Sequence, residues 1–160
     1  MNIRTLVGNG ILAALYIAVS MLIQPFGFTN VQFRISEMLN HLVVFNKKAI
    51  YGIVLGVFLT NLFFSPMIYD LVFGVGQSIL ALLATIISMR FIKGVWARMI
   101  FNTVIFTITM FMIAIELHLA FDLPFMLTWL TCAVGEFVVM AIGMPVMYWI
   151  NKRVQFEKFM

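Results

Sequence analysis

The sequence predicts an all-α integral membrane protein that forms a single transmembrane domain over residues 1–160, and its composition carries this prediction. Of the 160 residues, 64% are hydrophobic and only 10% are charged, whereas a soluble domain has about 25% charged residues. The mean hydropathy is +1.10, so polar groups are too few to cover a surface that faces water. A soluble enzyme and a nucleic-acid-binding module are therefore excluded. The single cysteine, Cys132, also excludes a disulfide framework.

Turn residues and charges divide the chain into six apolar segments. The expected helices are, in order, Thr5–Gln24, Ile35–Phe45, Ala49–Phe64, Asp70–Ile92, Arg98–Phe121 and Phe125–Asn151. A bilayer crossing needs about 20 apolar residues, so the second segment, about 17 Å long as a helix, is too short to cross alone. In the last segment we expect Pro145 to kink the helix, because proline cannot donate a backbone hydrogen bond.

The basic residues indicate the topology. Nine of the ten Lys and Arg residues cluster in the N-terminus, the turn at residues 46–48, the segment 90–98 and the C-terminal tail. Such clusters mark cytoplasmic loops. Six crossings with the N-terminus inside leave only Arg34 outside, whereas five crossings with the N-terminus outside leave only Arg4 as an exception. The basic residues therefore fit both arrangements.

The acidic residues favour six crossings. That arrangement places five of the six acids in the outer half of the bilayer, namely Glu37, Asp70, Glu116, Asp122 and Glu136. Their common depth indicates a shared site that faces outward. An ionisable side chain costs about 2.5–3.5 kcal/mol at the centre of a membrane helix. Because Glu116 and Glu136 interrupt apolar helices, we expect them to face a cavity, with snorkelling or a structural pair as the alternative.

Helical spacing groups further polar side chains with these acids, because residues three, four or seven apart share a helix face. The candidate binding residues are Arg34, Glu37, Asn40, Asn61, Asp70, Gln77, Glu116, Trp129 and Glu136. Besides Glu116 and Glu136, three of them have structural alternatives. Arg34 and Glu37 can form an ion pair within one segment, and Asp70 can cap a helix.

The remaining polar side chains carry weaker signals. Asn102 and Thr109 are seven residues apart on the helix face that also carries Glu116. His41 and His118 are more often hydrogen-bonded core or interface residues than metal ligands. We therefore expect neither a metal ion nor a cofactor.

Small residues recur at a spacing of four on two helices. The first row is Gly10, Ala14 and Ala18, and the second is Gly52 and Gly56. Such rows let two helices approach closely. For the first row, the partner is either another helix of this chain or another membrane subunit. The first helix also resembles a secretory signal, but its apolar run continues past the small-residue cleavage pattern.

One run of residues resembles the signature of the QueT family. It is Val31–Asn40, which reads Val-Gln-Phe-Arg-Ile-Ser-Glu-Met-Leu-Asn and directly follows a first helix ending in Gln-Pro-Phe. The segments Gly52–Gly56, Asn61-Leu62, Asp70–Gly74 and Gly135-Glu136 resemble that family too. The likeness extends over essentially the whole chain, and the run around Arg34 is its specific part.

Members of this family are expected substrate-binding S components of energy-coupling factor (ECF) transporters, associated with queuosine precursors. The resemblance implies six helices in the plasma membrane of a prokaryote, both termini in the cytoplasm and Ile35–Phe45 as a short second helix. The loop Pro25–Phe33 is expected to lie outside and help close the pocket. Ala14 and Ala18, in the row that begins at Gly10, match the residues with which related S components pack on the membrane coupling subunit. The resemblance also implies two ATPase subunits as partners. This chain has no Walker-type loop, so any ATP-driven role would need the ATPase on another chain.

The implied ligand is a 7-deazaguanine such as preQ1 or preQ0, and the residues do not distinguish between these and queuine. Its Watson–Crick edge presents adjacent N–H donors that a carboxylate accepts as a pair. An aminomethyl ammonium suits a second carboxylate or an aromatic face, and the flat ring suits stacking on Trp129 or a phenylalanine. A site rich in acids fits such a ligand better than a phosphate.

Two other functions remain open. A standalone transporter would use Glu116 and Glu136 to relay protons. A small intramembrane enzyme is the weakest alternative, because no His-Glu-x-x-His or Gly-x-Ser-x-Gly motif occurs. Only an S component requires a coupling subunit and ATPases, so co-purification separates it from a proton-coupled transporter.

Overall fold

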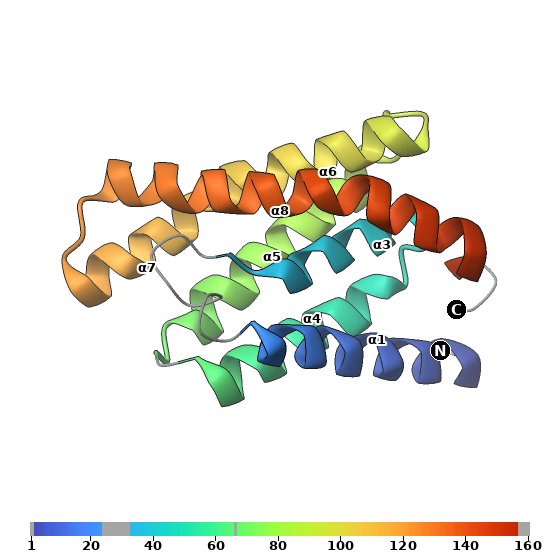
Figure 1. Ribbon diagram of the computed structural model, residues 1–160, viewed down its shortest axis with the longest axis horizontal. Helices are drawn as coiled ribbons and strands as arrows, with labels where there is room; N and C mark the ends of the chain where they lie inside the picture. The colour runs from blue at the N-terminus through green and yellow to red at the C-terminus, as the bar shows by residue number, and fades with distance from the viewer. Residues whose placement is uncertain (1, 24–32, 66, 157–160) are drawn as a thin grey trace.

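The computed structural model describes residues 2–23, 33–65 and 67–156, which form helices and turns without a β-strand. The elements are α1 (Ile3–Leu22), the 3₁₀ helix η1 (Ile35–His41), α3 (Leu42–Phe45), α4 (Ala49–Phe64), α5 (Asp70–Ser88), α6 (Val95–Thr109), α7 (Phe111–Phe121) and α8 (Phe125–Val154) (Figure 1). The predicted all-α fold is confirmed.

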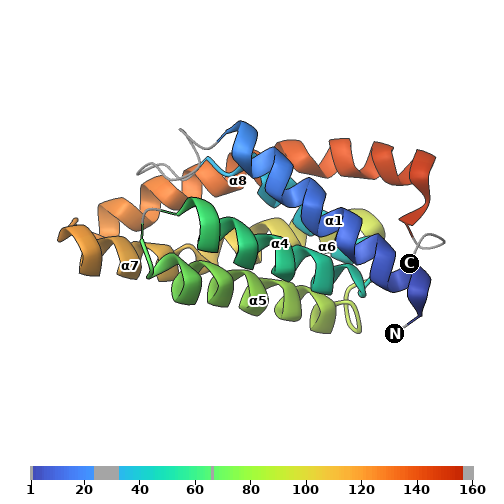
Figure 2. The same ribbon diagram turned by 90° about the horizontal axis from the view of Figure 1, so that it is seen from below.

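Six apolar helical stretches are present among the described residues, as the sequence predicts. Four are long enough to cross a membrane, Ile3–Leu22, Asp70–Ser88, Val95–Phe121 and Phe125–Val154, and two are shorter, Ile35–Phe45 and Ala49–Phe64. Large apolar side chains cover the outside of the bundle, and Phe91 and Phe63 are 80% and 70% exposed. Figures 1 and 2 place the start of α1 and the end of α8 at the same end of the bundle, as an even number of crossings requires.

The basic turn between α5 and α6 is longer than predicted, because α5 ends at Ser88 rather than at Ile92. Gly94 ends this turn with a φ of 96°, a left-handed conformation that residues with a Cβ rarely adopt. Arg98 stabilises the turn: its Nε donates to the carbonyl oxygen of Ile92 at 2.9 Å and its Nη2 to that of Met89 at 3.3 Å. Arg98 thus pairs carbonyl groups that the end of a helix leaves unpaired.

The helix predicted between the basic turn and Phe121 is present as one apolar stretch, Val95–Phe121, but a one-residue break at Met110 divides it into α6, which ends at Thr109, and α7. The Thr109 hydroxyl donates to the carbonyl oxygen of Ile105 at 2.9 Å and accepts from Gln77 Nε2 at 3.1 Å. Back-bonding of this kind bends helices. In Figure 1, α6 emerges above α8 and α7 lies below it. The face predicted to carry Asn102 and Glu116 together is therefore divided between two helices.

The short segment Ile35–Phe45 lies in the centre of the bundle (Figure 1). Its residues pack against α1, α4, α5, α6 and α8, and all of its side chains except Ile35 and Met38 are buried. Gly143 of α8 permits this position, because a Cβ there would lie only 2.6 Å from Met38 Cβ. The segment can be short because other helices, rather than lipid, surround it.

The last turns of α8 combine basic and aromatic side chains. The helix runs unbroken through Pro145 and bends along its length in both Figure 1 and Figure 2. Beyond the proline, the Lys152 ammonium lies 5.9 Å from the centre of the Tyr148 ring, and the Arg153 guanidinium lies 4.4 Å from that of Trp149. Such pairs are typical of a membrane–water interface.

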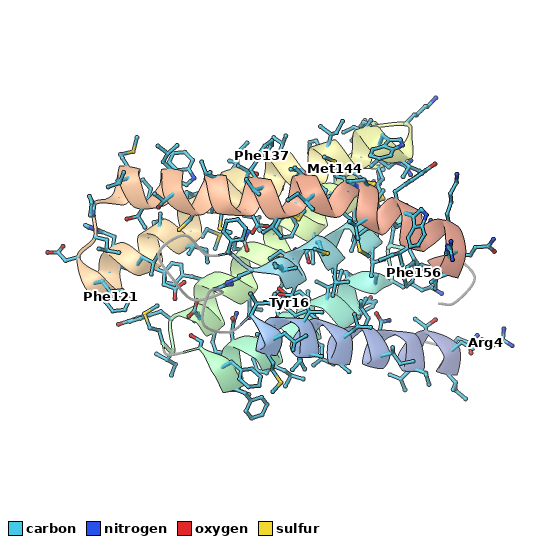
Figure 3. All side chains as sticks on the ribbon, in the orientation of Figure 1. Arg4, Tyr16, Phe121, Phe137, Met144 and Phe156 are labelled. Atoms are coloured by element: carbon cyan, nitrogen blue, oxygen red, sulfur yellow. The ribbon has the colours of Figure 1, made fainter. Side chains whose placement is uncertain are left out.

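The second small-residue row serves packing within the chain. The backbone N–H of Gly52 donates to Asn9 Oδ1 at 2.9 Å, and a Cβ at Gly52 would lie 2.7 Å from the Asn9 carbonyl oxygen. At Gly56, a Cβ would lie 2.7 Å from Tyr16 Cβ. The two glycines therefore allow α1 and α4 to approach closely, and they place Tyr16 on the side of α1 that faces the bundle (Figure 3).

Replacing Gly56 by alanine is expected to lower the melting temperature of the purified protein in detergent. Overpacking a close contact costs about 1–3 kcal/mol, which exceeds the roughly 0.5–1 kcal/mol that alanine gains over glycine within a helix. Gly10→Ala is the matched control, because a Cβ at Gly10 meets no atom within 4 Å. This control should keep or raise the melting temperature, and equal effects of both substitutions would contradict the packing described for Gly56.

Candidate functional site

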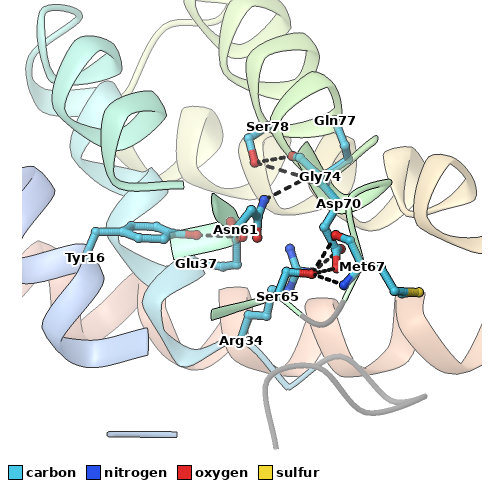
Figure 4. A network of polar contacts seen from close by, with 10 residues as sticks. All are labelled: Tyr16, Arg34, Glu37, Asn61, Ser65, Met67, Asp70, Gly74, Gln77 and Ser78. Carbon is cyan, nitrogen blue, oxygen red and sulfur yellow. Dashed lines mark hydrogen bonds and ion pairs between the residues drawn. The ribbon is translucent and has the colours of Figure 1, made fainter. Parts of the chain in front are cut away.

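A buried ion pair joins the start of η1 to the start of α5. Arg34 Nη2 lies 3.2 Å from Asp70 Oδ1, and both residues are less than 10% exposed. The other Asp70 oxygen accepts from the Ser65 hydroxyl, and the Asp70 carbonyl oxygen accepts from Asn61 Nδ2 at 3.1 Å (Figure 4). Asp70 therefore binds Arg34 rather than capping a helix, and Arg34 pairs across the bundle rather than with Glu37 in its own segment.

Glu37 lies beside this pair on η1. Its Oε1 accepts from the Tyr16 hydroxyl of α1 at 2.8 Å (Figure 4), and its Oε2 accepts from Asn40 Nδ2. The three side chains are at most 2% exposed. Tyr16 of α1 binds one carboxylate oxygen and Asn40, on η1 with Glu37, binds the other. Glu37 is therefore held in one orientation.

Glu116 on α7 and Glu136 on α8 complete a cluster of four acids from four elements. Both residues are 0% exposed, and no oxygen of either carboxyl group has a hydrogen-bond partner in the part of the chain that the structure describes. Glu116 lies closest in electrostatic terms to the Asp70 carboxylate and Glu136 to Glu37, and both are also within range of the Arg34 guanidinium. Buried carboxyl groups without donors are costly, so Glu116 and Glu136 are candidates for binding a ligand that supplies donors.

Gln77 and Asn102 occupy separate positions deeper in the bundle. Gln77, two turns after Asp70 on α5, donates to Thr109 as described above and so reinforces the break between α6 and α7. Asn102 Nδ2 lies 3.2 Å from His41 Nδ1, and His41 Nε2 lies 2.9 Å from the carbonyl oxygen of Met140. Because a carbonyl oxygen only accepts, Nε2 carries the proton and Nδ1 accepts from Asn102. His41 is thus a hydrogen-bonded core residue, as expected.

The structure does not bring Trp129 to the acid cluster. Its indole N–H donates to the carbonyl oxygen of Ile108 at 3.2 Å, and its ring lines a surface groove with apolar residues such as Leu127 and Leu130. These two leucines are about 60% exposed, so the groove faces the lipid side of the bundle. The placement gives no support to stacking of Trp129 on a ligand bound among the acids.

A small pocket at the end of α1 lies beside the cluster. Tyr16, Phe33, Arg34, Thr60 and Asn61 are among its lining residues, and Arg34 connects it to the acids through Asp70. Sequence reasoning missed Tyr16, Thr60 and Ser65. Their only signal was being polar within or beside apolar helices. The loop expected to close the pocket, at residues 25–33, lies outside the described residues except for Phe33.

The cluster has the properties of a recognition site. Cys132 is buried one turn before Glu136 and packs against Met110, Ile113 and Leu117. Within the described residues, no three His, Cys, Asp or Glu side chains converge in a way that could hold a metal ion. The acid cluster is therefore characterised by its negative charge, its hydrogen-bond acceptors and its burial.

Comparison with known proteins identifies the family. A family model described as QueT transporter matches residues 6–152. The chain belongs to the QueT transporter family. It is 33% identical over 156 residues to the "Queuosine precursor transporter QueT" of Lactococcus lactis subsp. cremoris (strain MG1363), and the comparison covers 92% of this chain and 92% of the relative. No solved structure matches this QueT-family chain.

Membership of the QueT family confirms the resemblance found in the sequence, because the match extends over nearly the whole chain. Membership of a transporter family also agrees with the long apolar helices of this chain and with the large apolar side chains exposed on the outside of the bundle. It gives no support to an intramembrane enzyme. In this QueT-family protein the buried acids are therefore candidates for binding what is transported.

Proposed function

We propose that this chain is the substrate-binding S component of an ECF importer and that its ligand is a queuosine precursor of the 7-deazaguanine class. The family description and the name of the Lactococcus relative support transport of such a precursor. The observation that carries the proposal is the pair Glu116 and Glu136. Both are fully buried, and their carboxyl oxygens lack hydrogen-bond donors among the described residues.

The chemistry of the site suits a ligand that is rich in donors. A 7-deazaguanine carries adjacent N–H and amino donors on its Watson–Crick edge, and a carboxylate accepts such donors as a pair. A phosphate or carboxylate ligand would instead meet four acids and one arginine, Arg34. Repulsion by like charges would therefore disfavour anionic ligands. The Asn61 side chain already donates to the Asp70 carbonyl oxygen. We therefore assign Asn61 and Asp70 to the wall of the site rather than to direct ligand contact.

The outward face of α1 supports a partner in the membrane. Gly10, Ala14 and Ala18 are all exposed, whereas the glycines of α4 pack on the opposite face of α1. Packing among the described residues therefore leaves the first small-residue row exposed. We assign this row to a membrane coupling subunit, which would act with two ATPase subunits in the plasma membrane of a prokaryote.

The experiment that tests this function identifies the ligand and then the energy source. The purified protein, from cells supplied with preQ1 or preQ0, should retain a 7-deazaguanine that mass spectrometry detects after denaturation. Uptake in proteoliposomes should require the coupling subunit, the ATPases and ATP. Absence of binding to either 7-deazaguanine would overturn the ligand assignment, and uptake by the chain alone in a proton gradient would identify a standalone transporter.

Substituting tryptophan for Ala14 or Ala18 is expected to disrupt assembly with the coupling subunit while ligand affinity stays near that of the wild type. A bulky side chain on the exposed row prevents close approach of a second helix, but it points away from Tyr16 and the acid cluster. Pull-down of the coupling subunit and calorimetry with ligand measure the two properties separately. Leu15→Trp, beside the row on the same exposed helix, controls for added bulk. Wild-type recovery of the coupling subunit by both alanine variants would contradict the docking assignment.

A further inference from the structure

The buried polar atoms of the site fall into a paired group and an unpaired group. In the paired group, Arg34 binds Asp70, and Glu37 accepts from Tyr16 and Asn40. Within the described residues, the atoms without a partner are Asn40 Oδ1, Thr60 Oγ1 and both carboxyl oxygens of Glu116 and Glu136. An amide oxygen and the oxygens of an ionised carboxylate only accept hydrogen bonds, whereas the Thr60 hydroxyl can donate or accept. What binds here must bring donors.

Glu116 and Glu136 approach the same region from two neighbouring helices. They lie on α7 and α8, which pack against each other. Both are within electrostatic range of Cys132 and of Arg34. The Arg34 guanidinium already binds Asp70, so one positive charge faces four acids in the buried cluster. A ligand that carries a positive charge would reduce this imbalance.

We infer that Glu116 and Glu136 take the two donor ends of one ligand, one accepting the Watson–Crick edge of a deazaguanine and the other accepting the ammonium of a 7-aminomethyl group. This assignment rests on the proposed function and adds to it a preference for the 7-aminomethyl compound over the 7-cyano compound. The 7-cyano compound presents a nitrile at the same position, and a nitrile can only accept hydrogen bonds. A nitrile therefore leaves one carboxylate unpaired and places an acceptor against it.

The wild-type protein is accordingly expected to bind the 7-aminomethyl compound about ten- to a hundredfold more tightly than the 7-cyano compound, the range that a charged hydrogen bond provides. Calorimetry of the wild type, Glu116→Gln and Glu136→Gln with both compounds tests the inference. The variant at the ammonium end should lose most of this preference, because the glutamine amide can donate to a nitrile. The variant at the base-edge end should bind both compounds more weakly than the wild type, by a similar factor, and so keep the preference for the 7-aminomethyl compound.

Asp122→Asn serves as the matched control, because Asp122 is an exposed acid at the corner between α7 and α8 with a φ of 56°, which asparagine tolerates. Its preference should equal that of the wild type. Equal wild-type affinity for the two compounds would overturn the inference, even if neither glutamine variant folds. An unchanged preference in both glutamine variants would also overturn it. Failure of the wild type to bind either compound would instead remove the proposed function itself.

Discussion

Replacing Arg34 by methionine is expected to destabilise the protein more than any other single substitution considered for the site. Arg34 is buried and pairs with Asp70 at 3.2 Å, so its loss leaves Asp70 and three further acids without a compensating charge. Breaking a buried ion pair by removing one partner costs about 3–5 kcal/mol. Thermal unfolding in detergent should show this loss as a large decrease in melting temperature.

Arg4→Met is the matched control, because it removes the same charge from an exposed position at the start of α1. It should leave the melting temperature nearly unchanged. The double substitution Arg34→Met with Asp70→Leu should recover part of the loss, because it removes the uncompensated carboxylate along with the guanidinium. A melting temperature for Arg34→Met equal to that of Arg4→Met would contradict the role of Arg34 as the counter-charge of the cluster.

Glu37→Gln is expected to weaken ligand binding about ten- to a hundredfold, which corresponds to roughly 1.5–3 kcal/mol. Glu37 retains lone pairs after binding Tyr16 and Asn40, so its carboxylate can accept a further donor such as the pyrrole N–H of a deazaguanine. The fold should survive the substitution. The glutamine oxygen can keep the Tyr16 hydrogen bond, and its amide can donate to Asn40 Oδ1, which has no partner among the described residues.

Tyr16→Phe separates the orientation of Glu37 from its charge. This substitution removes the hydroxyl that donates to Glu37 Oε1 and leaves the carboxylate in place. Its effect on affinity should be about tenfold or less, since a hydrogen bond contributes about 0.5–1.5 kcal/mol. Calorimetry that finds wild-type affinity for Glu37→Gln would show that Glu37 only supports the structure.

The number and order of the apolar helices could be predicted because bilayer thickness and turn residues leave a clear pattern in the sequence. Two boundaries could not, because they depend on contacts between helices. The end of α6 reflects the hydrogen bond between Gln77 and Thr109. The turn after α5 depends on Arg98, a residue of the following helix α6 that donates to two carbonyl oxygens of the turn.

The acids of the candidate site could be identified because charge is costly in a membrane and therefore conspicuous. Tyr16 and Thr60 are neutral, and placing them in a membrane helix costs less free energy than placing a charged side chain there. The sequence pattern therefore did not separate them from packing residues. Trp129 shows the limit of helical spacing. It is seven residues from Glu136 and shares its face, but it lies two turns nearer the start of α8, where Ile108 is its neighbour.

The enclosed position of the segment Ile35–Phe45 has a consequence for biogenesis. It consists of the seven residues of η1 and the four of α3, and it carries Glu37 and His41, so it is too short and too polar to enter lipid alone. The His41 hydrogen bond goes to Met140 of α8, which follows it by 99 residues in the chain. This segment therefore reaches its final place only after α8 has been synthesised, and until then its buried polar side chains lack the partners that the later helices provide.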